Sequence, residues 1–323
     1  MSETTLKEIA AQIKRAKNVA IFSHVRPDGD ALGSAFALFY ALKELGIQST
    51  VYNESETPAN LFFALKSEKM EKEVGARHDL FIAVDSADEQ RLGVLADAFC
   101  QAKRKKITTI NLDHHVSNPR FADYNRVVEC SANCMNVYRL VLELGVKLTP
   151  KIANLLLMGL LTDSGNFSHD DVTAETLEIA SALVAAGADV CSLNYHLFKK
   201  QSKARAALYA ETMSKIRYMH GDRFALIVIP SERLERYGAD KSDTEGFVDF
   251  PLNVETVEVC ASLMEMKKGQ YKISLRSKTY ADVNKIAAVY GGGGHVRAAG
   301  CMLFGELEEI IDKLSYTVSQ YLE

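Results

Sequence analysis

The first half of the chain alternates short apolar runs, rich in β-branched residues, with longer helical patterns, and this alternation limits the fold more than any other feature. The short runs predict strands at 18–22, 47–53, 79–84 and 107–112, and the last two are apolar enough to be buried on both faces. Helices are predicted at 35–45, 133–144, 151–162 and 173–186. A strand–helix alternation of this kind predicts an α/β domain with a doubly wound, mostly parallel sheet.

The pattern changes near residue 190. The segment 191–215 is polar and helical without a strand signal, and it predicts a helical linker. Beyond it, strands are predicted at 224–230, 257–266 and 270–277, and helices at 282–290 and 306–321. We therefore expect an N-terminal domain over 1–190 and a smaller α/β domain over 216–323, with a cleft between them.

The bulk composition excludes several classes of protein. A hydrophobic content of 47% with 25% charged residues is typical of globular proteins, and a net charge of −4 does not attract long nucleic acid. The six cysteines form no C-x-x-C pair, which argues against zinc ribbons and thioredoxin-like sites. The N-terminal segment lacks an apolar signal core, and the longest apolar run is about half of a membrane span. We expect a cytoplasmic protein with no membrane segment.

Carboxylate and histidine side chains follow several of the predicted core elements, at the point where each element ends. His24, Asp28 and Asp30 follow the strand at 18–22, and Asp85 follows the strand at 79–84. The strand at 107–112 is followed by Asp113, His114 and His115, and the helix at 151–162 by Asp163. Because ligands of open α/β sheets bind outside the carboxyl ends of the strands, we expect these side chains to gather there.

Each of these residues, taken alone, also fits a structural role. An Asp directly after a strand is most often a turn residue or a helix N-cap, as Asp30 would be for a helix from residue 31. His114 and His115 likewise fit an exposed polar loop. This interpretation weakens for the whole set, because the same chemistry recurs at the ends of several predicted core elements.

The charge of the set favours metal ions. Five carboxylates at one edge of a sheet repel one another and raise one another's pKa: Asp28, Asp30, Asp85, Asp113 and Asp163. Two divalent cations nearly cancel this charge, and mixed carboxylate and imidazole ligands suit manganese, iron or zinc better than calcium. Two metals about 3.5–4 Å apart activate water for in-line attack on phosphorus. The sequence therefore predicts a two-metal site, in which Gly29 lets Asp28 and Asp30 diverge to different ions.

A second cluster lies in VYGGGGHVRAAG, residues 289–300. A glycine run usually serves positive φ or a close approach of backbones, and this one has neither a Walker lysine nor the dinucleotide spacing. The exposed amides of this run, together with His295 and nearby Arg297, fit an anion site. Arg276, at a strand end, fits a bidentate phosphate contact. A flexible turn and a surface arginine remain the alternative.

Together, these motifs resemble the DHH phosphoesterase superfamily, in order along nearly the whole chain. Within it, the chain is similar to the branch that has a DHH-associated C-terminal domain and includes the nano-RNase/pAp phosphatases. The resemblance implies that residues 1–190 bind two divalent ions, Mn²⁺ first, with Mg²⁺ or Co²⁺ as substitutes. It implies that residues 216–323 hold the substrate, and a homodimer is compatible with the family.

The resemblance also implies a role for each motif residue. One metal would be held by His24, Asp28 and Asp85, and the other by Asp30, Asp85, His114 and Asp163, so that Asp85 bridges the two. Asp113 would orient His114, and His115 would contact the scissile phosphate or protonate the leaving oxygen.

Substrate would be bound by Arg276, His295, Gly293 and Gly294, whereas Arg91 would contact substrate or form a structural salt bridge. One departure is Met135, which stands where relatives tend to have an acidic residue. We expect its effect to be local, on contacts at the edge of the substrate.

The implied function is hydrolysis of oligonucleotides of about 2–5 nucleotides, linear dinucleotides included, to 5′-mononucleotides. Water activated by the two metals would also remove the 3′-phosphate from 3′-phosphoadenosine 5′-phosphate (pAp). Two alternatives stay open: a manganese-dependent pyrophosphatase or exopolyphosphatase with the same N-terminal motifs, and a non-catalytic nucleotide sensor. A sensor would normally show replaced ligands, and none of the expected ligands is replaced.

Overall fold

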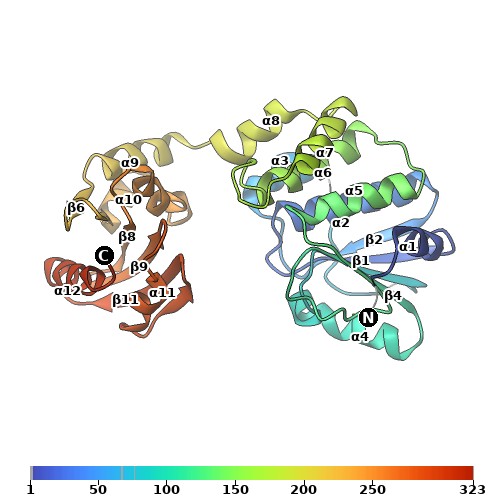
Figure 1. The fold of residues 1–323 in the computed structure, drawn as a ribbon, viewed down its shortest axis with the longest axis horizontal. Coiled ribbons are helices and arrows are strands. Elements are labelled where there is room, and N and C mark those ends of the chain that lie inside the picture. The colour runs from blue at the N-terminus through green and yellow to red at the C-terminus, as the bar shows by residue number, and fades with distance from the viewer. Residues whose placement is uncertain (1–2, 67, 76, 323) are drawn as a thin grey trace. The chain divides into compact units, whose positions relative to one another are not determined.

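The computed structural model describes residues 3–66, 68–75 and 77–322. The chain divides into two compact units, residues 1–200 and 201–323, each with a sheet of its own (Figure 1). We describe the two units separately.

The first unit is built on a five-stranded sheet in which all neighbours are parallel, in the order β2-β1-β3-β4-β5. The strands are β1 Asn18–Phe22, β2 Gln48–Tyr52, β3 Leu80–Val84, β4 Thr108–Asp113 and β5 Tyr124–Val127. All five residues of β3 are buried, as expected for a strand covered on both faces. The predicted parallel α/β fold is confirmed. The edge strand β5 was not predicted, because its four residues are mostly polar and only Asn125 is buried.

Helices cover both faces of this sheet, which makes it doubly wound. Helices α2 Gly29–Glu44 and α5 Asn133–Glu143 pack on one face, and α4 Ala96–Arg104 packs on the other (Figure 1). Helices α1 Leu6–Ile13, α6 Pro150–Asp163 and α7 Ala174–Ala185 belong to the same core as α2 and α5 and pack against these helices. Shorter helices are η1 Ala59–Leu61, α3 Phe62–Leu65, η2 Glu89–Leu95, α8 Val190–Asn194 and η3 Tyr195–Lys199.

Helix α2 begins six residues before the predicted start at 35. The Asp28 side chain is its N-cap and accepts hydrogen bonds from the amides of Asp30 and Ala31, both at 3.0 Å. A carboxylate N-cap stabilises the first turn, where four backbone amides lack partners within the helix. Asp30 therefore lies inside the helix rather than capping it.

The second unit has a six-stranded mixed sheet in the order β10-β11-β9-β8-β7-β6. Its strands are β6 Arg217–Met219, β7 Phe224–Ile229, β8 Val259–Lys267, β9 Gln270–Ser277, β10 Gly293–His295 and β11 Ala298–Phe304. Its helices are α9 Lys203–Met213, α10 Ser231–Tyr237, η4 Ser242–Thr244, η5 Phe247–Asn253, α11 Val283–Ala288 and α12 Leu307–Ser319. Strands β7, β8 and β9 were predicted; β6, β10 and β11 were not.

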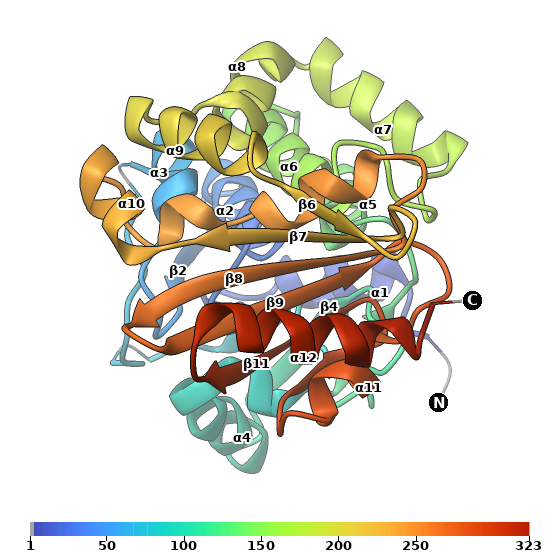
Figure 2. The same ribbon diagram turned by 90° about the vertical axis from the view of Figure 1, so that its left-hand side faces the viewer.

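The two faces of this second sheet are covered differently. Helices α11 and α12 pack on one face, against residues such as Leu263 and Ile273, and Figure 2 shows α12 lying across β9 and β11. On the other face, α9, α10 and η5 pack against β7 and β8, around Ile227 and Ile229. The side chains of Lys272, Ser274 and Arg276, which alternate with the buried residues of β9, also lie on this other face.

Across the described residues, no single helix is both long and apolar enough to span a bilayer. Among these residues, one pair of helices, Ala174–Ala185 and Val190–Lys199, passes the test of length and composition when taken together, but the pair is bent by 117°.

Candidate metal centre

The carboxyl edge of the parallel sheet brings six of the predicted ligands together. They fall into two groups, joined by a third that Asp85 and His114 form with His115, and within each group the candidate ligand atoms lie within 4.8 Å of one another. The first group is His24, Asp28 and Asp85, and the second is Asp30, His114 and Asp163. Their gathering follows from the parallel sheet, because β1, β3 and β4 are neighbours and end at the same edge.

Asp85 lies between the two groups. Its Oδ2 is 3.5 Å from His24 Nε2 in one group, and its Oδ1 is 3.4 Å from His114 Nε2 in the other. The residue is 2% exposed, and Oδ1 has no hydrogen-bond partner among the described residues. A buried carboxylate oxygen without a partner costs about 1–3 kcal/mol, and a cation between the groups would satisfy it.

The backbone of Asp85 is also unusual. Its φ is +49°, in the left-handed region that residues with a side chain seldom adopt. Such a conformation costs of order 1–3 kcal/mol and persists only where the surrounding structure imposes it, most often at functional sites. Here it turns the carboxylate from the end of β3 toward both imidazoles.

Asp30 is fully buried and is held by the N-terminus of α5. Its Oδ1 accepts a hydrogen bond from the Cys134 amide at 2.8 Å, and its Oδ2 accepts one from the Asn133 amide at 2.5 Å. Burial and the neighbouring carboxylates of Asp85 and Asp163 nevertheless raise the pKa of Asp30 well above its usual range. Each oxygen keeps a second lone pair, so the carboxylate is oriented but still able to bind a cation.

The two imidazoles are oriented by backbone carbonyls. His24 Nδ1 lies 3.0 Å from the Val25 oxygen, and His114 Nδ1 lies 2.9 Å from the Cys130 oxygen. In the tautomer with a proton on Nδ1, each ring donates to that oxygen and leaves Nε2 facing the carboxylates. A metal-binding histidine usually has such support for its second nitrogen.

The protonation of the metal-free site shows how much positive charge the carboxylates require. Burial lowers the pKa of His24, but its contacts with Asp28 and Asp85 outweigh burial and raise that pKa to about 10. Burial of His114 is likewise outweighed, by Asp85 and Asp30, which raise its pKa to about 11. For Asp163, burial raises the pKa to about 6. These residues fit divalent cations, which would supply the positive charge that protons supply in their absence.

Asp113 supports a different histidine from the one expected. His115 Nδ1 lies 2.9 Å from Asp113 Oδ1, and Asn118 Nδ2 donates to Asp113 Oδ2 at 2.7 Å. The prediction that Asp113 orients His114 is therefore wrong. Alternate residues of an extended chain project to the same side, so Asp113 faces His115, whereas His114 faces the carboxylates. The Asp113 contact also raises the pKa of His115.

The packing behind the site was not predicted. A side chain at Gly159, on α6, would collide with Cys134 Sγ and would lie 2.9 Å from the Cα of Asp30. A glycine inside the apolar pattern LLLMGLL was the available sequence signal for this close approach. Met135 is 1% exposed and packs near Thr176, which contradicts the expectation that it affects substrate contacts.

Two of the predicted substrate-binding residues share one row of the second sheet. Arg276 on β9 and His295 on β10 both pair with Ala298 on β11, so all three side chains point to the same face. Two strand spacings separate Arg276 from His295, roughly 10 Å. Arg276 Nε lies 3.2 Å from Asp249 Oδ1, and His295 is exposed.

The glycines before His295 differ in whether the surrounding structure leaves room for a side chain. Gly292 and Gly294 lie so close to the backbone of β11 that a Cβ at either position would collide with it. A Cβ at Gly293 would meet nothing closer than Asn284 Oδ1 at 3.6 Å, and its φ is not positive. Packing therefore explains Gly292 and Gly294, and it leaves open space at Gly293.

Arg91 is exposed, and the structure gives a role only to its backbone. Its carbonyl accepts a hydrogen bond from the Val25 amide at 2.8 Å, and its amide donates to the capping carboxylate of Asp88. None of the ion pairs found among the described residues involves Arg91, so the salt bridge considered for it is not observed.

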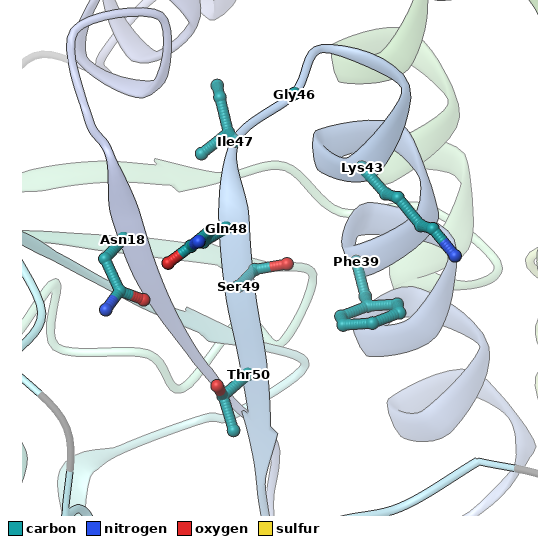
Figure 3. Close-up of a pocket in the computed structure, with 8 residues that line it drawn as sticks. All are labelled: Asn18, Phe39, Lys43, Gly46, Ile47, Gln48, Ser49 and Thr50. Carbon is teal, nitrogen blue, oxygen red and sulfur yellow. The ribbon is translucent and has the colours of Figure 1, made fainter.

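The first unit also has a groove of about 540 Å³, whose lining residues are drawn in Figure 3. It is lined by Asn18 and Gln48, the first residues of β1 and β2, and by Lys43 near the end of α2. This is the amino end of the strands, opposite the edge that carries the metal ligands. The groove has no carboxylate or histidine in its lining, and we assign it no part in the chemistry.

Comparison with known proteins identifies the family. The model of the DHH family N-terminal domain matches residues 18–160, and that of the DHHA1 domain matches residues 223–322. A bifunctional oligoribonuclease and PAP phosphatase of Thermus thermophilus is 33% identical over 97% of this chain and 94% of its own length. The chain belongs to the DHH family. DHH proteins are metal-dependent phosphoesterases, and the cluster at the sheet edge has the ligands that such chemistry needs.

Other DHH relatives are named for different substrates. A probable manganese-dependent inorganic pyrophosphatase of Bacillus licheniformis is 30% identical over 64% of this chain and 67% of its own length. The crystal structure of an exopolyphosphatase-related protein from Bacteroides fragilis has a TM-score of 0.83 at 26% identity. That match covers 98% of this chain and 96% of the other, so the two proteins share their fold over nearly their whole length.

Proposed function

We propose that this chain is a two-metal phosphoesterase that hydrolyses oligonucleotides of about 2–5 nucleotides to 5′-mononucleotides and removes the 3′-phosphate of pAp. The observation that carries the proposal is the position of Asp85, whose two oxygens face the imidazoles of two separate ligand groups. The full-length similarity to an oligoribonuclease and PAP phosphatase supports the choice of substrates.

The ligand assignment follows the two groups. One Mn²⁺ would be held by His24, Asp28 and Asp85, and the other by Asp30, Asp85, His114 and Asp163. When bound, two such ions lower the pKa of water and neutralise charge on the phosphoryl oxygens. The chain contributes the fixed positions of the ligands, above all through the α5 amides that hold Asp30.

His115 is proposed as the general acid. Asp113 holds the proton on Nδ1 of the His115 ring, and this contact raises the pKa of His115, so the ring is protonated more readily. The Nε2 proton of that partly exposed imidazolium would pass to the leaving oxygen as its bond to phosphorus breaks. Asn118, which donates to the other oxygen of Asp113, keeps the carboxylate in place.

The C-terminal unit is proposed to hold the substrate phosphate. Arg276 and His295 point to one face of its sheet, and the amides of Gly293 and Gly294 lie in the same strand as His295. In this proposal, residues 1–190 form the catalytic domain, 191–215 the linker and 216–323 the substrate-binding domain. Arg91, which is exposed, is kept as a proposed substrate contact.

Pyrophosphate hydrolysis is the second candidate, because a pyrophosphatase is among the relatives. That match covers 64% of this chain, whereas the match to the oligoribonuclease covers 97%, so we rank the nucleotide activity first. A non-catalytic sensor is disfavoured, since the candidate ligands are all present and gathered.

The test is a substrate panel with Mn²⁺: a dinucleotide, a long single strand, pAp and pyrophosphate. We expect the dinucleotide and pAp to be hydrolysed fastest, and a preference for pyrophosphate would overturn the proposal.

Arg276→Ala should raise KM for the dinucleotide roughly tenfold or more while bound metal stays constant, because charge-assisted hydrogen bonds to phosphate are strong. Arg217→Ala, which removes an exposed ion pair with Glu308 in the same unit, is the matched control.

A further inference from the structure

A groove of about 450 Å³ lies wholly within the second unit, on the face of the sheet opposite α12. We call it the β9 groove; its lining includes Lys241, Met264, Met266, Lys272, Ser274 and Arg276. Its floor comes from alternate residues of β8 and β9, and its wall comes from the segment 241–248. A cavity of this size is within the range of small-molecule sites, about 300–1,000 Å³.

The charge of the β9 groove selects anions. Three cationic side chains line it, those of Lys241, Lys272 and Arg276, against the single carboxylate of Glu245. Two more carboxylates lie beside the groove without lining it, Asp249, which pairs with Arg276, and Asp243 in the wall segment, so the positive excess belongs to the lining itself. The whole chain carries a net charge of −4, so this local excess of positive charge runs against the general trend. Positive charge gathered in a concave surface raises the local concentration of anionic ligands.

The floor of the groove is not that of a simple phosphate site. Met264, Met266 and Val248 give it an apolar stretch, while Ser262 and Ser274 offer hydroxyls beside it. A free phosphate ion gains nothing from apolar contacts, whereas a nucleotide carries an aromatic base as well as a charged group. Methionine side chains are flexible and contact aromatic rings favourably through sulfur, so they suit bases of different shape.

The spacing of the cations indicates more than one phosphate. Lys272 and Arg276 are four residues apart on β9, roughly 13 Å along the strand at about 3.3 Å per residue. Ser274 lies between them on the same face. Each cation is thus placed to bind a different phosphate of one extended ligand.

From these observations, and resting on the proposed function, we propose that the β9 groove is a second nucleotide subsite. The phosphate at Arg276 would be shared, the adjoining sugar would lie over Ser262 and Ser274, and the next phosphate would meet Lys272 and Lys241. A base would then lie over Met264 and Met266, which are beside Lys272. The groove would then favour substrates longer than the minimum, without a preference for one base.

The test compares the full-length protein with its Lys241→Ala/Lys272→Ala variant on pAp and on di-, tri- and tetra-adenylate, with Mn²⁺. We expect the ratio of kcat/KM for the tetranucleotide to that for pAp to fall about tenfold, through KM. For the tetranucleotide, the slope of log KM against log salt should decrease by roughly 0.7 for each lysine lost. Lys313→Ala, an exposed lysine on α12 and so on the opposite face, is the control and should change neither quantity.

An unchanged length ratio, or an equal loss on pAp and the tetranucleotide, would overturn the subsite. A wild-type protein that hydrolyses none of the four nucleotides would overturn the proposed function instead. In that event, binding of fluorescent tetra-adenylate to each variant is measured by fluorescence anisotropy in the presence of EDTA. This measurement tests the groove without hydrolysis. Weaker binding by the double variant than by Lys313→Ala would support it, and equal binding would overturn it.

Discussion

At the scale of single residues, Asp85 determines how the two ligand groups are joined. It is 2% exposed and holds a left-handed backbone, and this conformation costs free energy that the surrounding structure must offset. Asp85 also reaches an imidazole in each group, so the loss of its carboxylate affects both.

Asp85→Ala should therefore remove both bound ions and lower turnover on every substrate by roughly a thousandfold, since a two-metal site supplies several kcal/mol of transition-state stabilisation. Metal content by mass spectrometry and turnover on a dinucleotide test this. Asp312→Ala, an exposed carboxylate in α12, is the control. Full metal content in the Asp85 variant would show that the ligand assignment is wrong.

The apparent affinity for Mn²⁺ should rise with pH, by about tenfold per pH unit for each proton displaced. The pKa values of His24 and His114 are raised, to about 10 and about 11, so both rings are protonated at pH 7 and must lose that proton to bind an ion. Titration calorimetry between pH 6 and 9, in buffers of different ionisation enthalpy, measures the affinity and the protons released. A pH-independent affinity would contradict the prediction.

The same raised pKa values predict how the stability of the metal-free protein changes with pH. Protonated His24 and His114 stabilise the fold fully below about pH 6.5, the ordinary histidine pKa. That stabilisation is lost as the pH rises through about 10 and about 11, the pKa values of the folded state.

That these side chains gather at one edge of the sheet could be predicted from the sequence, but not all of their partners could. The spacing Asp113-His114-His115 identified the motif, yet which histidine Asp113 supports depends on the side of the chain to which each ring points. The hydrogen bonds from the Asn133 and Cys134 amides to Asp30 join segments about a hundred residues apart, and no local sequence pattern predicts them.

At the scale of elements, the close crossing of α2 and α6 supports the metal centre. Gly159→Ala should destabilise the fold by about 1–3 kcal/mol, because its methyl group would press on Cys134 Sγ and on the backbone of Asp30. Metal affinity should fall with it, since Asp30 is displaced. Thermal denaturation and Mn²⁺ titration measure the two effects.

The double variant Gly159→Ala/Cys134→Ala tests the cause of that effect. It should recover part of the lost stability, because the contact with sulfur is removed and that with Asp30 remains. A Gly159→Ala protein with lowered stability but unchanged metal affinity would separate the helix crossing from the metal centre.

Among the strands, those with apolar runs could be predicted, and those made by pairing alone could not. Strand β11 contains Ala298, Ala299 and Gly300, which have little β propensity, and it forms because its backbone pairs with β9 over seven residues. Strand β10 is a short glycine-rich partner of β11, in a segment that reads as a turn. Tertiary pairing overrides local preference in both.

At the scale of the whole molecule, the candidate metal ligands and the β9 groove belong to different compact units. The ligands lie between His24 and Asp163, in the unit of residues 1–200, and each unit has a hydrophobic core of its own. Alternation of strands and helices was sufficient to predict an α/β fold for both units. The strand order of either sheet could not be predicted, because it depends on which strands pair with one another in the folded chain.

Calorimetry of the full-length protein should show two unfolding transitions, of which EDTA lowers only one. Bound metal stabilises the unit that holds it, by about 2.7 kcal/mol for each ion at a free concentration of one hundred times Kd. Gly159→Ala should lower the same transition as EDTA does. A single transition that moves as a whole would contradict independent units.

The order of the strands is enough to explain the position of the proposed shared ligand, Asp85. Strand β3 lies between β1 and β4, so the residue that leaves its carboxyl end is the natural neighbour of both His24 and His114. Anyone transplanting this centre into another parallel sheet would have to start from three adjacent strands. The bridging carboxylate would then have to be installed at the exit of the middle one.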